Sequence, residues 1–474
     1  MAIEAAKANR PRLSLHVPEP RFRPGDRVDF SHLAIPPAGA QPRPDEACAP
    51  AETNPLCTDL LRVLGDDNQA HGPWDPHLSP DALRHMLRQM ALVRAFDGRM
   101  YRAQRQGKTS FYLKCTGEEA TSVAATHALD FEDMIFPSYR QQGCLIARDY
   151  PLVEMINQIF SNRADKLLGR QLPILYSARS VNFFTISGNL ATQLPQATGF
   201  AMASAIRGDS KIAAAWVGEG STAEGDFHCA LTFAAVYNAP AIFNVVNNQW
   251  AISSFSGFAG AERTTFAARA IGYGVAGLRV DGNDPLAVYA AERWAADRAR
   301  SNNGPTLIEF FTYRAEGHST SDDPTVYRSA QEREEWPLGD PVARLRDHLV
   351  AIGEWSVEAH EAMDAELDGQ VRAAAREAEK NGILGHGLHQ PDRTMFEDVF
   401  ETMPWHLREQ SQQAVRERNV KWPEAGAGQS GVIGGQEKAG SSGAGEGGAQ
   451  SGAGQSNPGQ SEVGQGGSGS GAGR

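Results

Sequence analysis

Cysteine is scarce in this sequence. Its 474 residues include five cysteines, namely Cys48, Cys57, Cys115, Cys144 and Cys229. Their number is odd and their spacing is wide, which excludes a CxxC pair and the usual zinc-ligand patterns. Scattered thiols of this kind are typical of a reducing compartment, so we expect a cytoplasmic protein.

Basic charge and long apolar runs are also lacking. The chain has 45 Lys and Arg against 57 Asp and Glu, a formal net charge of −12. Binding to nucleic acid or to an anionic membrane needs clustered positive charge, so we expect neither as a partner. No stretch reaches the roughly 18 apolar residues of a membrane span. The start, MAIEAAKANRPRL, lacks the apolar core of a secretion signal, so we expect no export.

Composition divides the chain into three parts. Residues 1–75 are punctuated by proline without a sustained period, which predicts an extended arm laid over a partner, although a mobile leader would look the same. Residues 424–474 hold 19 of the 48 glycines, mixed with Ser, Gln and Ala, which predicts a disordered tail. Residues 76–415 have ordinary globular composition and form the expected folded domain.

The middle part alternates apolar strands with helical patterns. Continuous apolar runs at 212–217, 241–246 and 306–313 are typical of strands buried on both faces of a parallel sheet. Ser79-Pro80-Asp81 is a helix start, and apolar residues follow it at helical spacing. After about residue 340 the pattern is helical. We therefore predict an α/β fold, a parallel sheet with helices on both faces.

Polar residues follow two consecutive strands of this pattern. Gly218-Glu219-Gly220 comes after the first, a helix is expected from about 222 to 237, and Asn247-Asn248 comes after the second. Parallel strands joined by a helix end at the same edge of the sheet, so Glu219 and Asn248 should lie side by side. Small residues at a helix start let backbone amides approach an anion. Carboxylate and amide oxygens suit Mg²⁺, so the motif predicts a site for a magnesium-bound diphosphate.

Gly-Glu-Gly, 26 further residues and Asn-Asn resemble the thiamin diphosphate fingerprint. The surrounding segments resemble, in the same order, the alpha subunit of the decarboxylase component of branched-chain 2-oxo acid dehydrogenase. They are FPSYRQQG (136–143), LGRQLPILY (168–176), SGNLATQLPQATG (187–199), RVDGNDPLAVY (279–289), TYRAEGHSTSDD (312–323) and MFEDVFETMPWHLREQ (395–410). The resemblance covers roughly residues 75–415 and implies a thiamin diphosphate-binding α/β fold for residues 76–415, with helices at its C-terminal end.

This resemblance implies a role for individual residues. Glu219, Asn248 and the Trp250 carbonyl match the Mg²⁺ ligands, and His318 matches the active-site histidine. The residues that match cofactor contacts are Tyr139, Arg140, Gly188, Leu190, Gly220, Ser221, Glu224 and Arg314. A structural potassium site is matched by Ser187, Thr192 and Gln193, although Asn189 stands where proline is usual.

Some positions depart from the family pattern. Val246 stands where mitochondrial members place an arginine on the diphosphate, so Arg140 and Arg314 should carry more of the charge compensation. Glu316 adds an acid near His318 without an assigned role. Ser319 matches the phosphorylation site of mitochondrial relatives, but without a known kinase an ordinary loop serine is the better interpretation.

The resemblance implies oxidative decarboxylation of branched-chain 2-oxo acids (3-methyl-2-oxobutanoate, 4-methyl-2-oxopentanoate and 3-methyl-2-oxopentanoate). The acyl group then passes to lipoyl groups of an acyltransferase core, and thiamin diphosphate serves as electron sink. In this family the glutamate that activates the cofactor comes from a separate beta subunit, so an alpha-two beta-two assembly is expected.

Two alternatives stay open. One is the alpha subunit of a pyruvate or acetoin dehydrogenase, although those relatives usually read His-Ser-Met-Ser-Asp where this chain has His318-Ser-Thr-Ser-Asp-Asp. The other is a subunit that only scaffolds a complex. The retention of Glu219, Asn248 and His318 together argues against it.

Overall fold

The computed structural model describes residues 14–384, 395–397 and 400–419. The chain divides into two units, Met1–Ser411 and Gln412–Arg474, and helix α12 (Trp405–Asn419) crosses the boundary between them. The predicted tail, 424–474, lies outside the described residues, so its disorder stays a prediction. Among the residues that are described, no helix is both long and apolar enough to cross a membrane.

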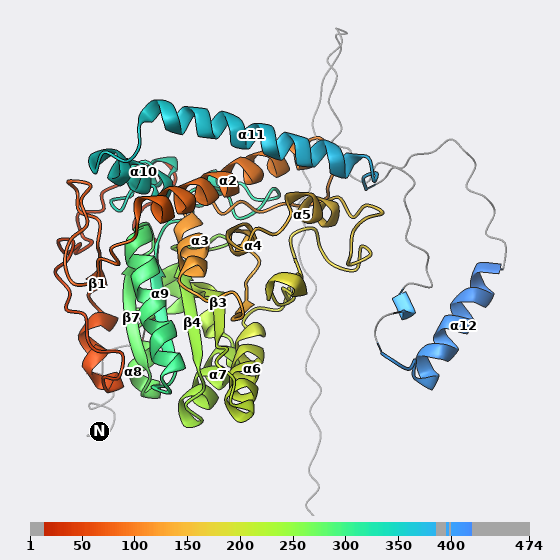
Figure 1. Cartoon of the computed structure of the whole chain (residues 1–474), viewed down its shortest axis with the longest axis horizontal. Helices are drawn as coiled ribbons and strands as arrows, with labels where there is room; N and C mark the ends of the chain where they lie inside the picture. The colour runs from red at the N-terminus through yellow and green to blue at the C-terminus, as the bar shows by residue number, and fades with distance from the viewer. Residues whose placement is uncertain (1–13, 385–394, 398–399, 420–474) are drawn as a thin grey trace, which may run out of the picture. The chain divides into compact units, whose positions relative to one another are not determined.

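A six-stranded parallel sheet forms the centre of the first unit, with the strand order β1-β7-β8-β4-β3-β2 (Figure 1). Its strands are β1 (Leu60–Leu61), β2 (Met134–Phe136), β3 (Ala213–Gly218), β4 (Ala241–Asn247), β7 (Ala276–Asp281) and β8 (Thr306–Phe311). Gly218 pairs with Val246, and Asn247 pairs with Phe311. The carboxyl ends of the three central strands therefore meet at one edge, which we call the carboxyl edge.

Both faces of the sheet are buried, because alternate side chains of β4 enter two different cores. Ile242 and Val246 belong to one core, and Phe243 and Val245 belong to the other. The first core contains α2 (Pro80–Arg105), α3 (Glu119–His127), α4 (Gln142–Ala147), α5 (Leu152–Ile159), α9 (Pro285–Arg300), α10 (Pro341–Ala351) and α11 (Val357–Glu379). The second contains α6 (Gln193–Arg207), α7 (Gly225–Val236) and α8 (Arg269–Tyr273). The predicted α/β fold, with helices on both faces of a parallel sheet, is confirmed.

The predicted element starts agree with the structure in one helix and differ in another. Ser79 caps α2 as expected, since its hydroxyl accepts a hydrogen bond from the Ala82 amide at 3.3 Å. The helix expected from about residue 222 begins later, at Gly225, because residues Glu219–Ala223 form a separate 3-10 helix, η3. Glu219 therefore begins η3 and does not lie at the start of α7, which corrects the sequence prediction.

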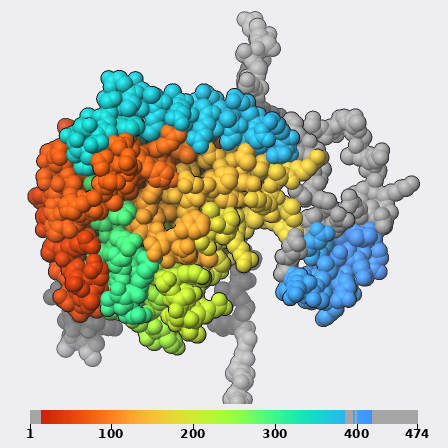
Figure 2. All heavy atoms as spheres, viewed as in Figure 1, coloured from red at the N-terminus to blue at the C-terminus, as the bar shows by residue number. Residues whose placement is uncertain are grey.

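The N-terminal segment contributes a strand to the sheet and packs against the helix α9. After the 3-10 helix η1 (Pro50–Cys57), β1 pairs in parallel with β7 at the sheet edge. The buried Trp74 lies with its ring centroid 6.2 Å from that of Trp294 on α9. Figure 2 shows this red-to-orange segment beside the green α9. The domain boundary at residue 75 and the role of the segment as an arm stay predictions.

Candidate active site

The carboxyl edge brings Glu219 and Asn248 together, as the sequence predicts. Glu219 begins η3 immediately after β3, and Asn248 follows β4, the neighbouring strand. Their exposed fractions are 2% and 8%. The backbone amide of Asn248 and the guanidinium of Arg314 both act to lower the pKa of the Glu219 carboxyl. The two residues therefore share one buried polar site.

The Glu219 carboxylate has an unused acceptor. Its Oε1 atom is buried and accepts no hydrogen bond from the part of the chain that the structure describes. Burial is the largest cause that raises the pKa of Glu219, and the negative charge of Glu118 raises it further. Backbone amides and Arg314 act in the opposite direction, and the resulting pKa is about 7. A buried carboxylate without a donor is destabilising unless a cation or a proton completes it.

A metal at this edge would need ligands of another kind in addition to the Glu219 carboxylate. Within the described ranges there is no group of three or more His, Cys, Asp or Glu side chains that could hold a metal ion. Besides Glu219, the oxygens proposed for it are Asn248 Oδ1, which accepts one hydrogen bond from the Trp250 amide, and the Trp250 carbonyl, which accepts one from Arg314. Such hard oxygen ligands suit Mg²⁺, which keeps several of its ligands as water or phosphate oxygens.

Asn248 is held at both ends of its side-chain amide. Its Nδ2 donates to Glu118 Oε1 at 2.9 Å, and its Oδ1 accepts from the Trp250 backbone amide at 3.2 Å. Glu118, which directly precedes α3, is 2% exposed and also lies 3.6 Å from Arg140 Nε. Sequence reasoning missed Glu118, because Gly117-Glu118 is one of four Gly-Glu pairs in the chain and no predicted strand precedes it.

Arg314 is almost completely buried, with 1% exposed, and its N–H groups are used within the chain. It donates to the hydroxyl of Tyr327 at 2.8 Å and to the backbone carbonyls of Trp250 (2.8 Å), Ile252 (2.8 Å) and Glu316 (3.2 Å). In this arrangement Arg314 positions the Trp250 carbonyl and the loop around it. Its predicted contact with the cofactor stays a prediction.

His318 lies between the two arginines. Its Nδ1 accepts from Arg140 at 3.2 Å and faces Arg314 at 3.5 Å, and the Tyr139 ring lies edge-on at 5.8 Å between centroids. Partial burial, together with the charges of Arg140 and Arg314, lowers the pKa of His318 to about 3. The imidazole is therefore neutral near pH 7, and because Nδ1 accepts, its proton is on Nε2.

The loop that carries His318 is fixed by Asp322. Asp322 Oδ2 accepts from the His318 backbone amide at 2.6 Å and from the Tyr327 hydroxyl at 2.6 Å. Glu316, whose role the sequence left open, pairs with Lys114 at 3.3 Å and Arg333 at 3.4 Å. Glu316 therefore ties the outer part of this loop to two neighbouring segments.

Gly220 allows η3 to touch the short strand β5 (Trp250–Ala251), which pairs with β6 (Ser254–Phe255). A Cβ atom at Gly220 would lie 2.5 Å from Ala251 Cβ, too close for any side chain without a shift. The neighbouring predicted residues differ in exposure, since Ser221 is buried and Glu224 is exposed. The glycine therefore brings η3 against the strand that begins with Trp250.

The predicted potassium ligands lie in one segment. Ser187 Oγ accepts from the Asn189 amide at 3.0 Å, and Thr192 Oγ1 donates to the Asn189 carbonyl at 3.1 Å. Gln193 is buried and donates to the Trp216 carbonyl of β3 at 2.6 Å. Ser187 and Thr192 are thus both bonded to the Asn189 backbone, whereas Gln193 is bonded to β3, and the potassium site itself stays a prediction.

Gly188 and Leu190, two predicted cofactor contacts, are exposed on this same segment, Leu190 to 45%. Within the described part of the chain, no hydrogen bond or ion pair joins either residue to Glu219 or Asn248. The role of Gly188 and Leu190 as cofactor contacts therefore stays a prediction.

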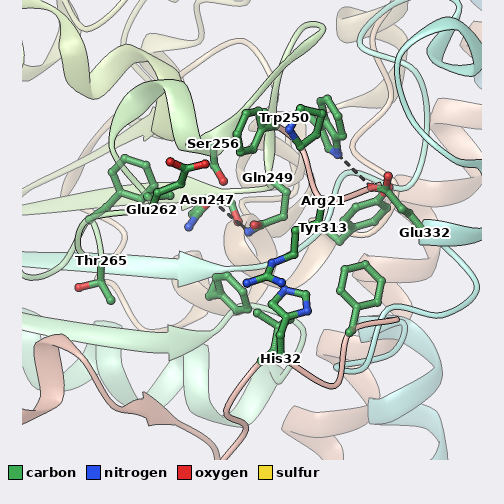
Figure 3. Close-up of a pocket in the computed structure, with 18 of the residues that line it drawn as sticks. Arg21, His32, Asn247, Gln249, Trp250, Ser256, Glu262, Thr265, Tyr313 and Glu332 are labelled. Atoms are coloured by element: carbon green, nitrogen blue, oxygen red, sulfur yellow. Dashed lines mark hydrogen bonds between the residues drawn. The ribbon is translucent and has the colours of Figure 1, made fainter. Parts of the chain in front are cut away.

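A cavity of about 680 Å³ lies beside the predicted site (Figure 3). It is lined by Arg21 and His32 of the N-terminal segment and by Asn247 and Gln249, whereas Asn248 bonds to Glu118. Of the predicted site residues, Trp250 lines this cavity, and Figure 3 shows its indole directed at Glu332, to which it donates at 3.2 Å. In the segment that follows β4, Asn247 and Gln249 thus face the cavity, whereas Asn248 faces Glu118.

Comparison with known proteins identifies the family. The family described as Dehydrogenase E1 component matches residues 87–386. The chain belongs to this family. Dehydrogenase E1 components depend on thiamin diphosphate, so the predicted cofactor is confirmed at the family level. A second family, described as 2-oxoisovalerate dehydrogenase E1 alpha subunit N terminal, matches residues 11–51.

Similar E1 chains are named as alpha subunits. A 2-oxoisovalerate dehydrogenase subunit alpha from Pseudomonas aeruginosa is 58% identical over 401 residues, which cover 85% of this chain and 98% of the relative. The mitochondrial subunit alpha from Bos taurus is 40% identical over 362 residues, 75% of this chain and 77% of the relative. The mitochondrial subunit alpha 1 from Arabidopsis thaliana is 41% identical over 388 residues, 81% and 80% of the two chains.

These similarities confirm the resemblance to branched-chain alpha subunits that the sequence motifs predict. They do not favour the pyruvate alternative. An E1 alpha subunit implies a beta subunit and an acyltransferase core, although the specific partners are not identified by the similarity.

Proposed function

We propose that this chain is the alpha subunit of the decarboxylase component of a branched-chain 2-oxo acid dehydrogenase complex. Together with its beta subunit it would decarboxylate 3-methyl-2-oxobutanoate, 4-methyl-2-oxopentanoate and 3-methyl-2-oxopentanoate, and transfer the acyl group to lipoyl groups of the acyltransferase core. The observation that carries the proposal is the buried Glu219 Oε1, which has no hydrogen-bond partner among the described residues, beside Asn248 at the carboxyl edge of an E1 fold. The names of the similar alpha subunits support the substrate class.

The metal in this proposal is Mg²⁺, bound by Glu219, by Asn248 Oδ1 and by the Trp250 carbonyl. Glu219 Oε1, which meets no donor in the described part of the chain, supports the assignment because a cation would remove the penalty of a buried carboxylate oxygen without a donor. When bound, thiamin diphosphate supplies the electron sink for decarboxylation. Potassium would be held by Ser187, Thr192 and Gln193.

The cofactor contacts divide between charged and uncharged groups. Arg140 and Arg314 are the two cationic candidates for the diphosphate, because Val246 is a buried core residue without charge. Both guanidinium groups already donate to protein groups, Arg140 to His318 and Arg314 to the Trp250 and Ile252 carbonyls. The remaining contacts of this proposal are Tyr139, Gly188, Leu190, Gly220, Ser221 and Glu224.

The proposed role of His318 follows from its neutral state. A neutral imidazole with its proton on Nε2 can donate a hydrogen bond to a substrate oxygen, while Arg140 holds Nδ1. An anionic group bound near Arg140 and Arg314 would offset the two charges that lower the pKa of His318. With the anion bound, the pKa of His318 would rise, and a protonated His318 would serve as general acid toward the lipoyl sulfur.

We also propose an alpha-two beta-two assembly in the cytoplasm. Helices α6 and α7 leave large apolar side chains on their surface, with Ile206 exposed to 84%, Val236 to 71% and Phe233 to 49%. Exposed apolar patches of this kind commonly mark protein contacts, which supports packing against a second subunit. The N-terminal arm would lie over a partner, and the tail, 424–474, would be a disordered appendage.

The proposal is tested by co-expressing the chain with a candidate beta subunit and measuring carbon dioxide release from a panel of 2-oxo acids. With thiamin diphosphate and Mg²⁺ present, we expect the three branched-chain acids to be preferred over pyruvate. Preference for pyruvate would favour the pyruvate or acetoin alternative. Stable assembly without bound thiamin diphosphate and without release from any 2-oxo acid would favour the scaffold subunit.

A further inference from the structure

Glu118 is a buried carboxylate at the site that no motif of the sequence assigns. Its Oε1 accepts from Asn248 Nδ2 at 2.9 Å and lies 3.6 Å from Arg140 Nε. Glu118 and Asn248 are 130 positions apart in the sequence, and their exposed fractions are 2% and 8%. The contact therefore joins two segments inside a site from which water is largely excluded.

The contact decides which end of the Asn248 amide faces the site. A side-chain amide has an oxygen end that can bind a cation and an NH₂ end that cannot. Because a carboxylate only accepts hydrogen bonds, Glu118 selects the orientation in which Nδ2 faces it and Oδ1 faces away, where Oδ1 accepts from the Trp250 amide at 3.2 Å. We propose that Glu118 is a positioning residue that holds Asn248 with Oδ1 toward the Mg²⁺ position; this inference rests on the proposed function.

The neighbouring glutamate shows what a purely structural carboxylate looks like here. Glu119 is also fully buried, but its Oε1 pairs with Arg94 of α2 at 2.7 Å and its Oε2 accepts from the Gly117 amide at 2.9 Å. The two adjacent carboxylates therefore point to different parts of the molecule, Glu118 to Asn248 and Glu119 to α2. Glu119 provides a matched control for the loss of a buried charge.

The experiment measures metal affinity in the assembled enzyme. The full chain is co-expressed with its beta subunit, supplied with thiamin diphosphate and titrated with Mn²⁺ in place of Mg²⁺, and free Mn²⁺ is followed by electron paramagnetic resonance. We expect Glu118→Ala to weaken Mn²⁺ binding by about 10–100-fold, the usual effect of removing a partner that orients a metal ligand. Glu118→Gln keeps an acceptor for Asn248 Nδ2 and should bind Mn²⁺ close to the parental affinity.

The control variant, Glu119→Gln, should keep the parental Mn²⁺ affinity even if its melting temperature falls. If Glu118→Ala fails to assemble, Glu118→Met takes its place, because Met fills a similar volume without an acceptor and should show the same weakening.

Two results would overturn the inference while the proposed function stands: a variant without an acceptor that binds Mn²⁺ as tightly as the parent, or a Glu118→Gln variant as weak as Glu118→Ala. A parental enzyme that binds no Mn²⁺ with thiamin diphosphate would overturn both the proposed function and this inference.

Discussion

Two glutamates in this molecule are both almost fully buried but differ in whether a proton or a cation would best satisfy their carboxylate oxygens. Glu219 lies at the carboxyl edge and Glu292 lies on α9, and they are 2% and 0% exposed. In the part of the chain that the structure describes, each has one carboxylate oxygen without a partner, Oε1 in Glu219 and Oε2 in Glu292. Burial is the main cause in both cases, and it raises the pKa of Glu219 to about 7 and that of Glu292 to about 8.

The neighbouring amides make the difference. Asn244 Nδ2 donates to Glu292 Oε1 at 3.1 Å, and Asn244 Oδ1 is itself buried without a donor in the described residues. If Glu292 is protonated on Oε2, the resulting O–H group is a hydrogen-bond donor in place of a carboxylate acceptor. Beside Glu219, in contrast, Asn248 Nδ2 is already bonded to Glu118, whereas Asn248 Oδ1 accepts one hydrogen bond, from the Trp250 amide, and keeps a second lone pair for a cation. The site of Glu292 and Asn244 is therefore suited to a proton and the carboxyl edge to a cation.

The largest effect is expected from replacing His318, because this removes the proposed proton donor at the carboxyl edge and leaves the proposed cation ligands in place. In His318→Ala, overall complex activity should fall by roughly 10²–10⁴, the usual scale for a general acid or base. Binding of Mg²⁺ and thiamin diphosphate should be nearly intact. Decarboxylation with an artificial electron acceptor should fall less than lipoyl acylation if proton donation dominates. Near-parental rates in both assays, with assembly intact, would make His318 a structural residue.

Glu219→Ala tests the cation side of the comparison. Removing this proposed ligand should weaken binding of Mg²⁺ and thiamin diphosphate by about 2–5 kcal/mol, with little loss of fold because Glu219 begins a short edge helix. Calorimetric titration measures the affinity, and Asn248→Ala should behave similarly. Glu292→Gln is the matched control and should bind like the parent. Parental affinity in both edge variants would contradict the metal assignment.

Glu292→Gln tests the proton side. The pKa of Glu292 is raised from 4.5 to about 8, so between these values the folded state binds a proton that the unfolded state has released. The free energy of unfolding should therefore decrease as pH rises from about 4.5 to about 8, by up to about 1.4 kcal/mol per pH unit. Gln stands in for the protonated acid and should remove this contribution. Denaturant midpoints of parent and variant, measured from pH 5 to pH 8, should diverge as pH rises; parallel curves would contradict the proton interpretation.

The smallest effect is expected from the tail, which belongs to neither site. Deleting residues 424–474 should leave the melting temperature and turnover unchanged, because a Gly-, Ser- and Gln-rich segment offers little apolar surface to pack. Thermal melts and the carbon dioxide assay measure both properties. A shift of several degrees would mean that the segment docks on the folded part or on a partner.

The sequence by itself determined the features that depend on local periodicity and chain connection. The apolar runs at 212–217, 241–246 and 306–313 match β3, β4 and β8, because a strand buried on both faces needs a continuous apolar run. The positions of Glu219 and Asn248 follow from the same reasoning, since a strand-helix-strand unit places both strand ends at one edge.

Only the tertiary structure decided the contacts between segments that are distant in the chain. Glu118 reaches Asn248 across 130 positions, and Arg140 reaches His318 across 178, so no window of sequence contains either pair. The low pKa of His318 also depends on the tertiary structure, because it results from burial together with the charges of two arginines from different segments. A periodic pattern records which face of an element is buried, but it carries no information about which distant polar group that face will meet.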